Sequence, residues 1–252
     1  MTTPIYESRE LLDQYLLFHY GSEKEILPYP GGPRDALGYP VRCALECQSQ
    51  KIHHPGNENL RALDLGCAVG RSTFEIARAY HEVIGVDFSH QFINTAKILK
   101  AQGDFAYSRI EEGSRKTQLN ASVPHEIDRS RVQFEQGDAC NLRKDLGSFH
   151  LILMANLIDR LPNPKACLER LPNLLFPKGI LVITSPYTWM EVYTPKDQWT
   201  GGTDDKTTLE GLRAVLEPNF NLLKTKDMPF LIREHARKFQ WSVAQASIWQ
   251  NN

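Results

Sequence analysis

The chain has 252 residues, of which 41% are hydrophobic and 23% are charged, a composition that favours a packed core over global disorder. At about 150 residues per domain, this length corresponds to one or two domains. The 29 basic and 30 acidic residues give a formal net charge of -1, which disfavours binding to nucleic acid or to an anionic membrane surface. No apolar stretch approaches the length of a membrane span, and no secretory signal is visible at the N-terminus.

The five cysteines are an odd number in a chain too long for a small disulfide scaffold, which favours reduced thiols and a cytoplasmic location. Cys43 and Cys47, followed by His53 and His54, raise the possibility of a zinc site. The two cysteines are also one helical turn apart, and packing on one helix face is the favoured interpretation. We therefore expect no metal site.

The N-terminal region combines helical patterns with a loop rich in proline and glycine. Apolar and aromatic residues at helical spacing predict a helix within Ile5–Tyr20, and Val41–Gln50 has a second helical pattern. Between them, Leu27–Pro33 can be neither a helix nor a central strand, so it is an ordered loop or a lid. We expect residues 1–55 to form a helical cap on a single α/β domain, 1–252, whose core spans residues 60–252.

From Leu60 onward, short apolar runs alternate with helical patterns. Strands are expected at Leu60–Leu65, Glu82–Asp87, Arg131–Glu135, Phe149–Met154 and Gly179–Thr184, and helices at Arg71–Tyr80, Gln91–Gln102, Pro164–Leu175 and Leu209–Leu216. Pro172 should end or kink the third of these helices. Asp104–Ser130 reads as a polar, irregular insertion, and Phe220–Lys226 and Trp241–Trp249 as a final antiparallel pair. This alternation predicts an α/β fold with a mostly parallel sheet covered on both faces.

The segment Asp64-Leu-Gly-Cys-Ala-Val-Gly70 joins the first strand to its helix. Gly66 and Gly70 permit a sharp turn and the close approach of a ligand, and Ala68 keeps the middle position small. The helix N-terminus that follows favours anionic groups. The spacing differs from G-x-G-x-x-G and from a phosphate-binding P-loop. A turn between a strand and a helix also carries glycines for structural reasons alone, so further signals are needed.

Three further polar residues follow the next predicted strands. Asp87 ends the second strand, where a carboxylate can accept hydrogen bonds from both ribose hydroxyls; the structural alternative is a helix cap formed by Asp87 or Ser89. Asp138, in Gly-Asp-Ala-Cys after the third strand, can accept a hydrogen bond from the adenine amine. Asn156 follows the fourth strand, at the edge where α/β sheets bind ligands.

As a set, these four motifs resemble the class I S-adenosylmethionine-dependent methyltransferases. The resemblance implies a three-layer Rossmann-like fold with a seven-stranded, mostly parallel sheet whose last strand is antiparallel, and S-adenosyl-L-methionine as cofactor. It implies that Asp64 lies near the cofactor's amino group, that the loop Gly66 to Gly70 follows its methionine part, and that Asp87 binds the ribose. The remaining cofactor-binding positions are Cys67 and Ala68 in that loop, Phe88 against the base, Asp138 and Ala139 near the adenine, and Asn156.

The N-terminal segments Tyr6-Glu-Ser, Tyr15–Gly21 and Leu27–Pro40 more particularly resemble the methyltransferase family of ovothiol biosynthesis, usually found as the C-terminal domain of 5-histidylcysteine sulfoxide synthase. Tyr107–Gly113 and Arg131–Cys140 are similar as well, so the resemblance covers nearly the whole chain. It implies methylation of 5-thiohistidine on the imidazole nitrogen nearer the backbone, the π position, to give ovothiol A. No iron-dependent synthase part is found, so we expect a stand-alone enzyme with no obligate protein partner and no role for nucleic acid or membrane.

Methyl transfer to an imidazole requires a nitrogen with a free lone pair, so orientation matters more than a strong general base. His19 and Asn156 are the catalytic candidates, and Arg34 could clamp a carboxylate. The candidates for substrate binding are Tyr15, Tyr20, Tyr29, Arg34, Tyr187 and Trp189, with Arg233 and His235, expected between the last two strands, as weaker possibilities. A histidine or tyrosine at helical spacing is more often a packing residue, and Arg34 could equally be a solvated loop residue. The charged stretch Arg109–Lys116 is expected to be a solvated face.

Two other functions remain open. The enzyme could methylate another small imidazole or thiol, or the chain could be a non-catalytic relative that binds the cofactor. A nucleic-acid methyltransferase is less favoured, because the charge is balanced and Asn156-Leu-Ile-Asp lacks a Pro-Pro-Tyr type motif.

Overall fold

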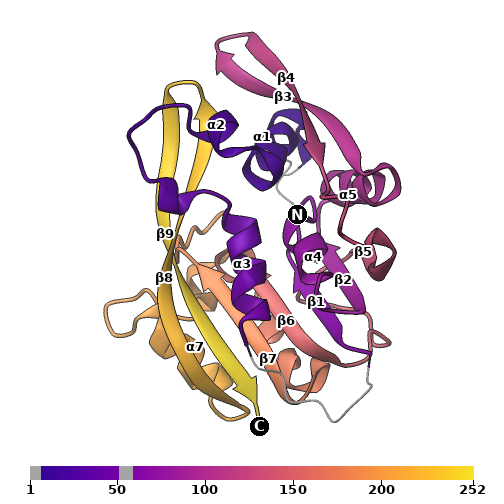
Figure 1. Cartoon of the computed structure of the whole chain (residues 1–252). Coiled ribbons are helices and arrows are strands. Elements are labelled where there is room, and N and C mark those ends of the chain that lie inside the picture. The colour runs from indigo at the N-terminus through magenta and orange to yellow at the C-terminus, as the bar shows by residue number, and fades with distance from the viewer. Residues whose placement is uncertain (1–6, 51–58) are drawn as a thin grey trace.

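One sheet of seven strands forms the centre of the protein in a computed structural model that describes residues 7–50 and 59–252 (Figure 1). The strand order is β5-β2-β1-β6-β7-β9-β8. The strands are β1 (Arg61–Leu65), β2 (Glu82–Asp87), β5 (Val132–Gln136), β6 (Phe149–Ala155), β7 (Leu175–Ser185), β8 (Phe220–His235) and β9 (Lys238–Asn251). The first five strands of this order are parallel, and β9 runs antiparallel between β7 and the edge strand β8. The predicted seven-stranded sheet with its last strand antiparallel is confirmed.

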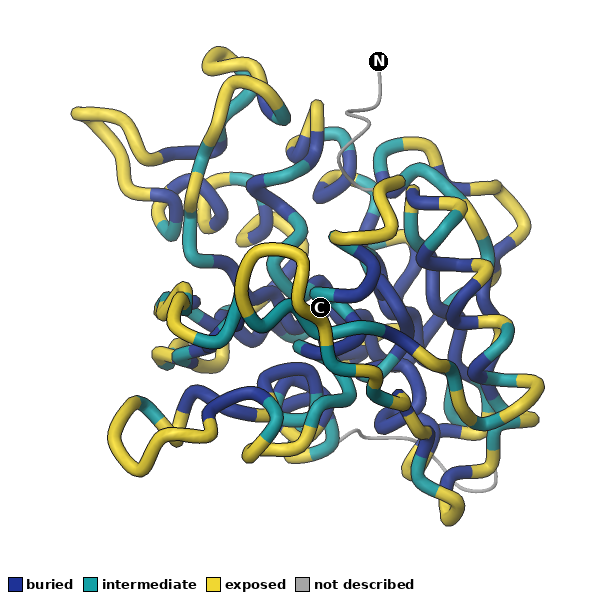
Figure 2. The backbone as a smooth tube through the Cα atoms, turned by 90° about the horizontal axis from the view of Figure 1, so that it is seen from above, coloured by how far each residue is buried: buried dark blue, intermediate teal, exposed yellow. Residues whose placement is uncertain are grey.

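The central strands are short apolar runs because both of their faces are covered. Two separate clusters of buried side chains lie on the two faces of the sheet. One cluster includes residues of α1 (Arg9–Tyr20), α3 (Tyr39–Gln48), α4 (Arg71–Ile76) and α5 (His90–Gln102). The other includes residues of α6 (Pro164–Arg170) and α7 (Thr208–Leu216). Figure 2 shows the buried centre and the exposed loops around it. The fold therefore has three layers, as predicted.

The N-terminal segment packs its helices against the first of these faces. Ser8 caps α1 by accepting a hydrogen bond from the Leu11 N–H, so the expected helix begins at Arg9. A short helix, α2 (Glu23–Ile26), and a 3₁₀ turn at Arg34–Ala36 flank the proline-rich loop. Helix α3 begins two residues earlier than expected, because Gly38 turns the chain at φ 61° and Pro40 fits the first helical turn.

Cys43 and Cys47 are both fully buried in α3. They pack on one helix face, as predicted. The expected partners of a zinc site, His53 and His54, lie outside the described residues. Among residues 7–50 and 59–252, no group of three potential metal ligands occurs. No helix in the same ranges is long and apolar enough to cross a membrane.

The prediction of an irregular insertion at Asp104–Ser130 was wrong. The segment contains an antiparallel hairpin of β3 (Asp104–Glu112) and β4 (Arg115–Ser122), which turns at Gly113. Its strands are polar because most of their residues are at least partly exposed, and the fully buried Tyr107 and Ala121 were too few to show an apolar period.

Four smaller expectations also need correction. The expected solvated face includes Arg109, whose side chain is only 15% exposed and pairs with Glu111. Strands β8 and β9 are longer than predicted, so Arg233 and His235 lie within β8 instead of between strands. Helix α4 ends at Ile76 instead of Tyr80. Helix α6 ends at Arg170 and continues as a 3₁₀ turn, Leu171–Leu174, because Pro172 cannot extend the hydrogen-bonding pattern of the helix.

Candidate active site

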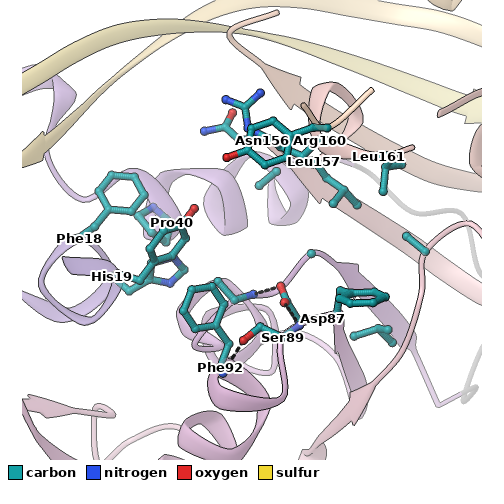
Figure 3. A pocket seen from close by; sticks show the side chains of 18 of the residues that line it. Phe18, His19, Pro40, Asp87, Ser89, Phe92, Asn156, Leu157, Arg160 and Leu161 are labelled. Carbon is teal, nitrogen blue, oxygen red and sulfur yellow. Dashed lines mark hydrogen bonds between the residues drawn. The ribbon is translucent and has the colours of Figure 1, made fainter. Parts of the chain in front are cut away.

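A cavity of about 780 Å³ lies where the parallel strands β1, β2, β5 and β6 end, within the size range of small-molecule sites (Figure 3). The loops that follow these strands form one side of it. Helices α1 and α3 contribute the residues that face them, which are Gln14, Tyr15, Phe18, His19, Tyr39 and Pro40. Parallel strands bring their carboxyl ends to one edge of the sheet, so loops distant in sequence meet here.

Asp87 holds the loop after β1 in place. Its Oδ2 atom accepts a hydrogen bond from the Ala68 N–H at 2.9 Å, and its Oδ1 atom accepts one from the Ser89 N–H at 2.9 Å. Ser89 in turn caps α5 by accepting from the Phe92 N–H. The helix cap that was the structural alternative for Asp87 or Ser89 is therefore present, and Ser89 forms it. Asp87 still faces the cavity.

Two residues of this loop have left-handed backbone conformations. Gly66 has φ 75° and Ala68 has φ 47°. A Cβ atom at Gly66 would lie 2.9 Å from the Leu157 side chain. Because residues other than Gly, Asn and Asp rarely adopt such angles, Ala68 stores backbone strain beside the cavity, and strained residues tend to occur at functional sites.

Other residues of the same motif lie beneath the cavity surface. Asp64 is 1% exposed, and its Oδ2 atom accepts a hydrogen bond from the Thr73 hydroxyl at 2.7 Å. Cys67 is buried, with its Sγ atom toward Gly85 of β2. A Cβ atom at Gly70 would come within 2.5 Å of the Phe134 ring, so glycine is required there for packing of the helix start. None of these three residues lines the cavity.

Burial changes the titration of both acidic residues of this region. It raises the pKa of Asp64 to about 7 and that of Asp87 to about 6, although hydrogen bonds from Thr73, Ala68 and Ser89 act in the opposite direction. Asp87 is therefore mostly ionised at pH 7 and can accept hydrogen bonds from a ligand.

Phe88, Asp138 and Ala139 line the cavity beside Asp87, from the loops after β2 and β5. Phe88 is 49% exposed, so its ring is accessible to a planar ligand. One oxygen of Asp138 accepts a hydrogen bond from the Cys140 N–H at 2.8 Å, and the other carboxylate oxygen remains for a ligand.

Asn156, at the end of β6, is held by two hydroxyl groups. Its Oδ1 atom lies 2.9 Å from the Tyr39 hydroxyl and 3.3 Å from the Thr184 hydroxyl, and the two hydroxyls are 2.7 Å apart. Its backbone adopts φ 52°, another left-handed conformation in the cavity wall. Because the amide oxygen is occupied, the NH₂ group remains as the donor for a ligand.

His19 lies on α1 in the opposite wall, near the rings of Tyr15 and Phe18. Its Nδ1 atom is buried and has no hydrogen-bond partner in the described part of the chain. Burial, together with the charge of Arg71, lowers the pKa of His19 to about 3. The imidazole is therefore neutral near pH 7, and a ring nitrogen can accept a hydrogen bond from a ligand.

Five of the expected substrate-binding residues lie outside the cavity lining, because other elements of the fold hold them. The hydroxyls of Tyr20 and Tyr29 donate to the carbonyls of Val69 and Ala236. Arg34 donates to the Tyr29 carbonyl and lies on the exposed loop.

The other two residues follow β7. The Tyr187 hydroxyl donates to the side chain of Gln245 at 2.9 Å. Trp189 stacks on Trp199 and donates to the Thr208 hydroxyl at 2.9 Å. Tyr15 is the only expected substrate-binding residue in the described ranges that lines the cavity.

Several lining residues were not predicted from the sequence as site residues. Glu7 accepts hydrogen bonds from the N–H groups of His90 and Gln91, at the start of α5. Arg160 lies four residues after Asn156 in the same loop, and this short spacing could have identified it. Phe18 and Tyr193 offer no comparable signal, because their neighbours in the cavity are remote in sequence.

Residues 63–183 match the family described as "Methyltransferase domain". No curated protein is significantly similar to the chain in sequence. Among solved structures, the N-methyltransferase NodS from Bradyrhizobium japonicum WM9 in complex with S-adenosyl-L-homocysteine is similar in fold, with 14% identity, a TM-score of 0.51, and coverage of 95% of this chain and 98% of that one.

Two further structures show the same fold. One, described as "Conversion of a Disulfide Bond into a Thioacetal Group during Echinomycin Biosynthesis", has a TM-score of 0.55 at 14% identity and covers 97% of this chain and 93% of that one. The YcgJ protein from Bacillus subtilis has a TM-score of 0.52 at 13% identity and covers 84% of this chain and 97% of that one.

Residues 63–183 thus match a methyltransferase domain, and the chain as a whole has the Rossmann-like fold of the class I methyltransferases. The methyltransferase domain makes the chain an enzyme, and S-adenosyl-L-methionine is the cofactor of such domains. The residues present fit that cofactor, because the cavity offers an ionised carboxylate at Asp87, a half-exposed aromatic ring at Phe88 and a glycine in its wall at Gly66.

Proposed function

We propose that this methyltransferase acts in the cytoplasm on 5-thiohistidine, methylates the π nitrogen of its imidazole ring and yields ovothiol A. One observation carries the proposal. Five residues of α1 and α3 that line the cavity, Tyr15, Phe18, His19, Tyr39 and Pro40, all belong to the two N-terminal segments that resemble the ovothiol family. The segments that carry the family resemblance are thus the ones available to contact the methyl acceptor.

In this proposal the loops after the strands hold the cofactor. Asp87 binds the ribose hydroxyls, Phe88 packs on the adenine with Asp138 and Ala139 beside it, and the backbone at Gly66 and Ala68 follows the methionine part. When bound, S-adenosylmethionine supplies the methyl group on its sulfonium. Asp64, Cys67 and Gly70 support this loop from below, through the contacts described above.

The residues of the opposite wall select the reactive form of the substrate. His19 is neutral and accepts a hydrogen bond from the N–H of the second ring nitrogen, which holds the proton there and leaves the lone pair of the π nitrogen free. Asn156 donates from its NH₂ group and orients the acceptor. Tyr15 and Phe18 supply apolar surface that excludes water. The protein's contribution is orientation and desolvation, which is what a displacement at a sulfonium requires.

Incubation with S-adenosylmethionine and 5-thiohistidine, followed by mass spectrometry, tests the proposal. We expect a product heavier by one methylene unit, with the methyl group on the π nitrogen. The absence of this product from protein that binds S-adenosylhomocysteine would refute the substrate assignment. A panel with histidine and other small imidazoles and thiols would then identify the acceptor, which is the second candidate function.

A further inference from the structure

Arg160 is the single arginine or lysine among the described residues that line the cavity. The other charged side chains in the lining are the carboxylates of Glu7, Asp87 and Asp138. A positive charge at one point of an otherwise acidic wall marks where an anionic group of a ligand is favoured.

One nitrogen of the Arg160 guanidinium is fully used by the protein. The Nη1 atom donates to the Asp159 carbonyl at 2.9 Å, to Asp159 Oδ2 at 3.0 Å and to the Thr188 carbonyl at 2.7 Å. The guanidinium also lies 5.0 Å from the centre of the Tyr193 ring, in a cation–π contact. These contacts fix the plane of the group.

The Nε and Nη2 atoms of Arg160 donate to no acceptor within the described ranges. Together they form an edge of the guanidinium that can bind both oxygens of a carboxylate in a bidentate manner. Arg160 and Asp159 form an ion pair, and of the two only Arg160 lines the cavity. The Arg160 side chain is 25% exposed, whereas that of Asp159 is 1% exposed. The structure therefore presents a preorganised and partly desolvated carboxylate receptor.

We propose that the Nε–Nη2 edge of Arg160 binds a carboxylate of the methyl acceptor, so that the enzyme selects carboxylate-bearing small molecules. This rests on the proposed function, in which the group is the α-carboxylate of 5-thiohistidine. The sequence suggested this role for Arg34, which lies outside the cavity. Figure 3 shows Arg160 on the same side of the cavity as Asn156 and Leu157. The cofactor also has a carboxylate, in the methionine part that the proposed function places along Gly66 and Ala68, and the experiment below distinguishes it from the carboxylate of the acceptor.

Calorimetric titration of protein saturated with S-adenosylhomocysteine tests the assignment, using 5-thiohistidine and its decarboxylated counterpart 5-thiohistamine. We expect the wild type to bind the acid about 10- to 100-fold more tightly, as for a charge-assisted hydrogen-bonded pair. Arg160→Gln should lose this preference and bind both ligands equally. Arg160→Lys, which keeps the charge near Asp159 but lacks the fork, should retain part of it. Arg213→Gln, at an exposed arginine of α7, is the matched control and should behave as wild type.

Equal affinity of the wild type for the two ligands would overturn the assignment without reliance on any variant, and so would failure of both to bind. A tenfold loss of S-adenosylhomocysteine affinity in Arg160→Gln, with unchanged discrimination between acid and amine, would assign Arg160 to the cofactor's carboxylate instead. Arg160-dependent binding of 5-thiohistidine without methylation would refute the proposed function and support the carboxylate site. Methylation of 5-thiohistidine with a KM that Arg160→Gln leaves unchanged would support the proposed function and refute the carboxylate site.

Discussion

Asp87 has two tasks at the scale of a single residue, because its carboxylate fixes the loop at Ala68 and also faces the cavity. Asp87→Ala should weaken binding of S-adenosylhomocysteine by about 1–3 kcal/mol, the free energy of hydrogen bonds to a charged group. Calorimetric titration measures this. Asp145→Ala, which removes an exposed carboxylate paired with Arg143, is the control. Unchanged cofactor affinity in Asp87→Ala would place the ribose elsewhere.

The same carboxylate predicts a pH dependence. Burial raises the pKa of Asp87 to about 6, so the group becomes protonated as the pH falls through that value and then accepts hydrogen bonds poorly. We expect the affinity for S-adenosylhomocysteine to decrease below about pH 6 and to be retained at pH 7, in titrations between pH 5 and 8. Asp87→Asn should remove the dependence. If Asp64→Asn removes it instead, the titrating group is Asp64, whose pKa burial raises to about 7.

At the scale of elements, the turn from β1 to α4 depends on Gly70 for packing. The residue has φ 84°, and an added Cβ atom would meet the ring of Phe134 in β5. Gly70→Ala should lower the free energy of unfolding by about 2–4 kcal/mol, from backbone strain and overpacking together. Urea denaturation measures the change. Gly113→Ala, in the β3–β4 turn, is the matched control, since it has φ 53° but open space around it, and should cost only about 1–2 kcal/mol. Equal losses would show that the Phe134 contact is unimportant.

At the scale of the whole molecule, a cluster of partly buried ions fastens the β3–β4 hairpin to the rest of the fold. Glu111 of β3 pairs with Arg233 of β8 at 2.8 Å and also with Arg109. Both arginines donate to the carbonyl of Glu25 in α2. Three segments remote in sequence, α2, β3 and β8, therefore meet in this cluster, and the Arg233 side chain is only 2% exposed.

Glu111→Gln should therefore lower the free energy of unfolding by about 2–4 kcal/mol, because it leaves a buried arginine without its counter-charge. The neighbouring Glu112→Gln breaks an exposed pair with Arg115 and should change it by at most about 1 kcal/mol. Comparison of the two variants by urea denaturation separates the effect of burial from that of charge. Similar values for both would show that the cluster does not hold the hairpin.

The sequence by itself determined the central sheet and the wall of the cavity that the loops after the strands form. Strands β1, β2 and β6 are buried on both faces, so they appear as short apolar runs, and the residues directly after them must meet at one edge. For this reason Gly66, Asp87, Asp138 and Asn156 could be placed at the cavity from local pattern alone. The position of each depends on a few neighbouring residues and on the parallel topology.

Only the tertiary structure decided which side chains form the opposite wall. Tyr39 reaches Asn156 across 117 positions of the chain, and the hairpin β3–β4 is fastened by Arg233, more than 100 positions away. From the sequence alone, Arg34 and Arg160 are equally plausible as residues that bind a carboxylate. Of the two, only Arg160 lines the cavity. The spacing of apolar residues shows which face of a helix or strand is buried. Which polar side chains line the cavity depends on how remote elements pack and on which hydrogen-bond donors that packing leaves unpaired.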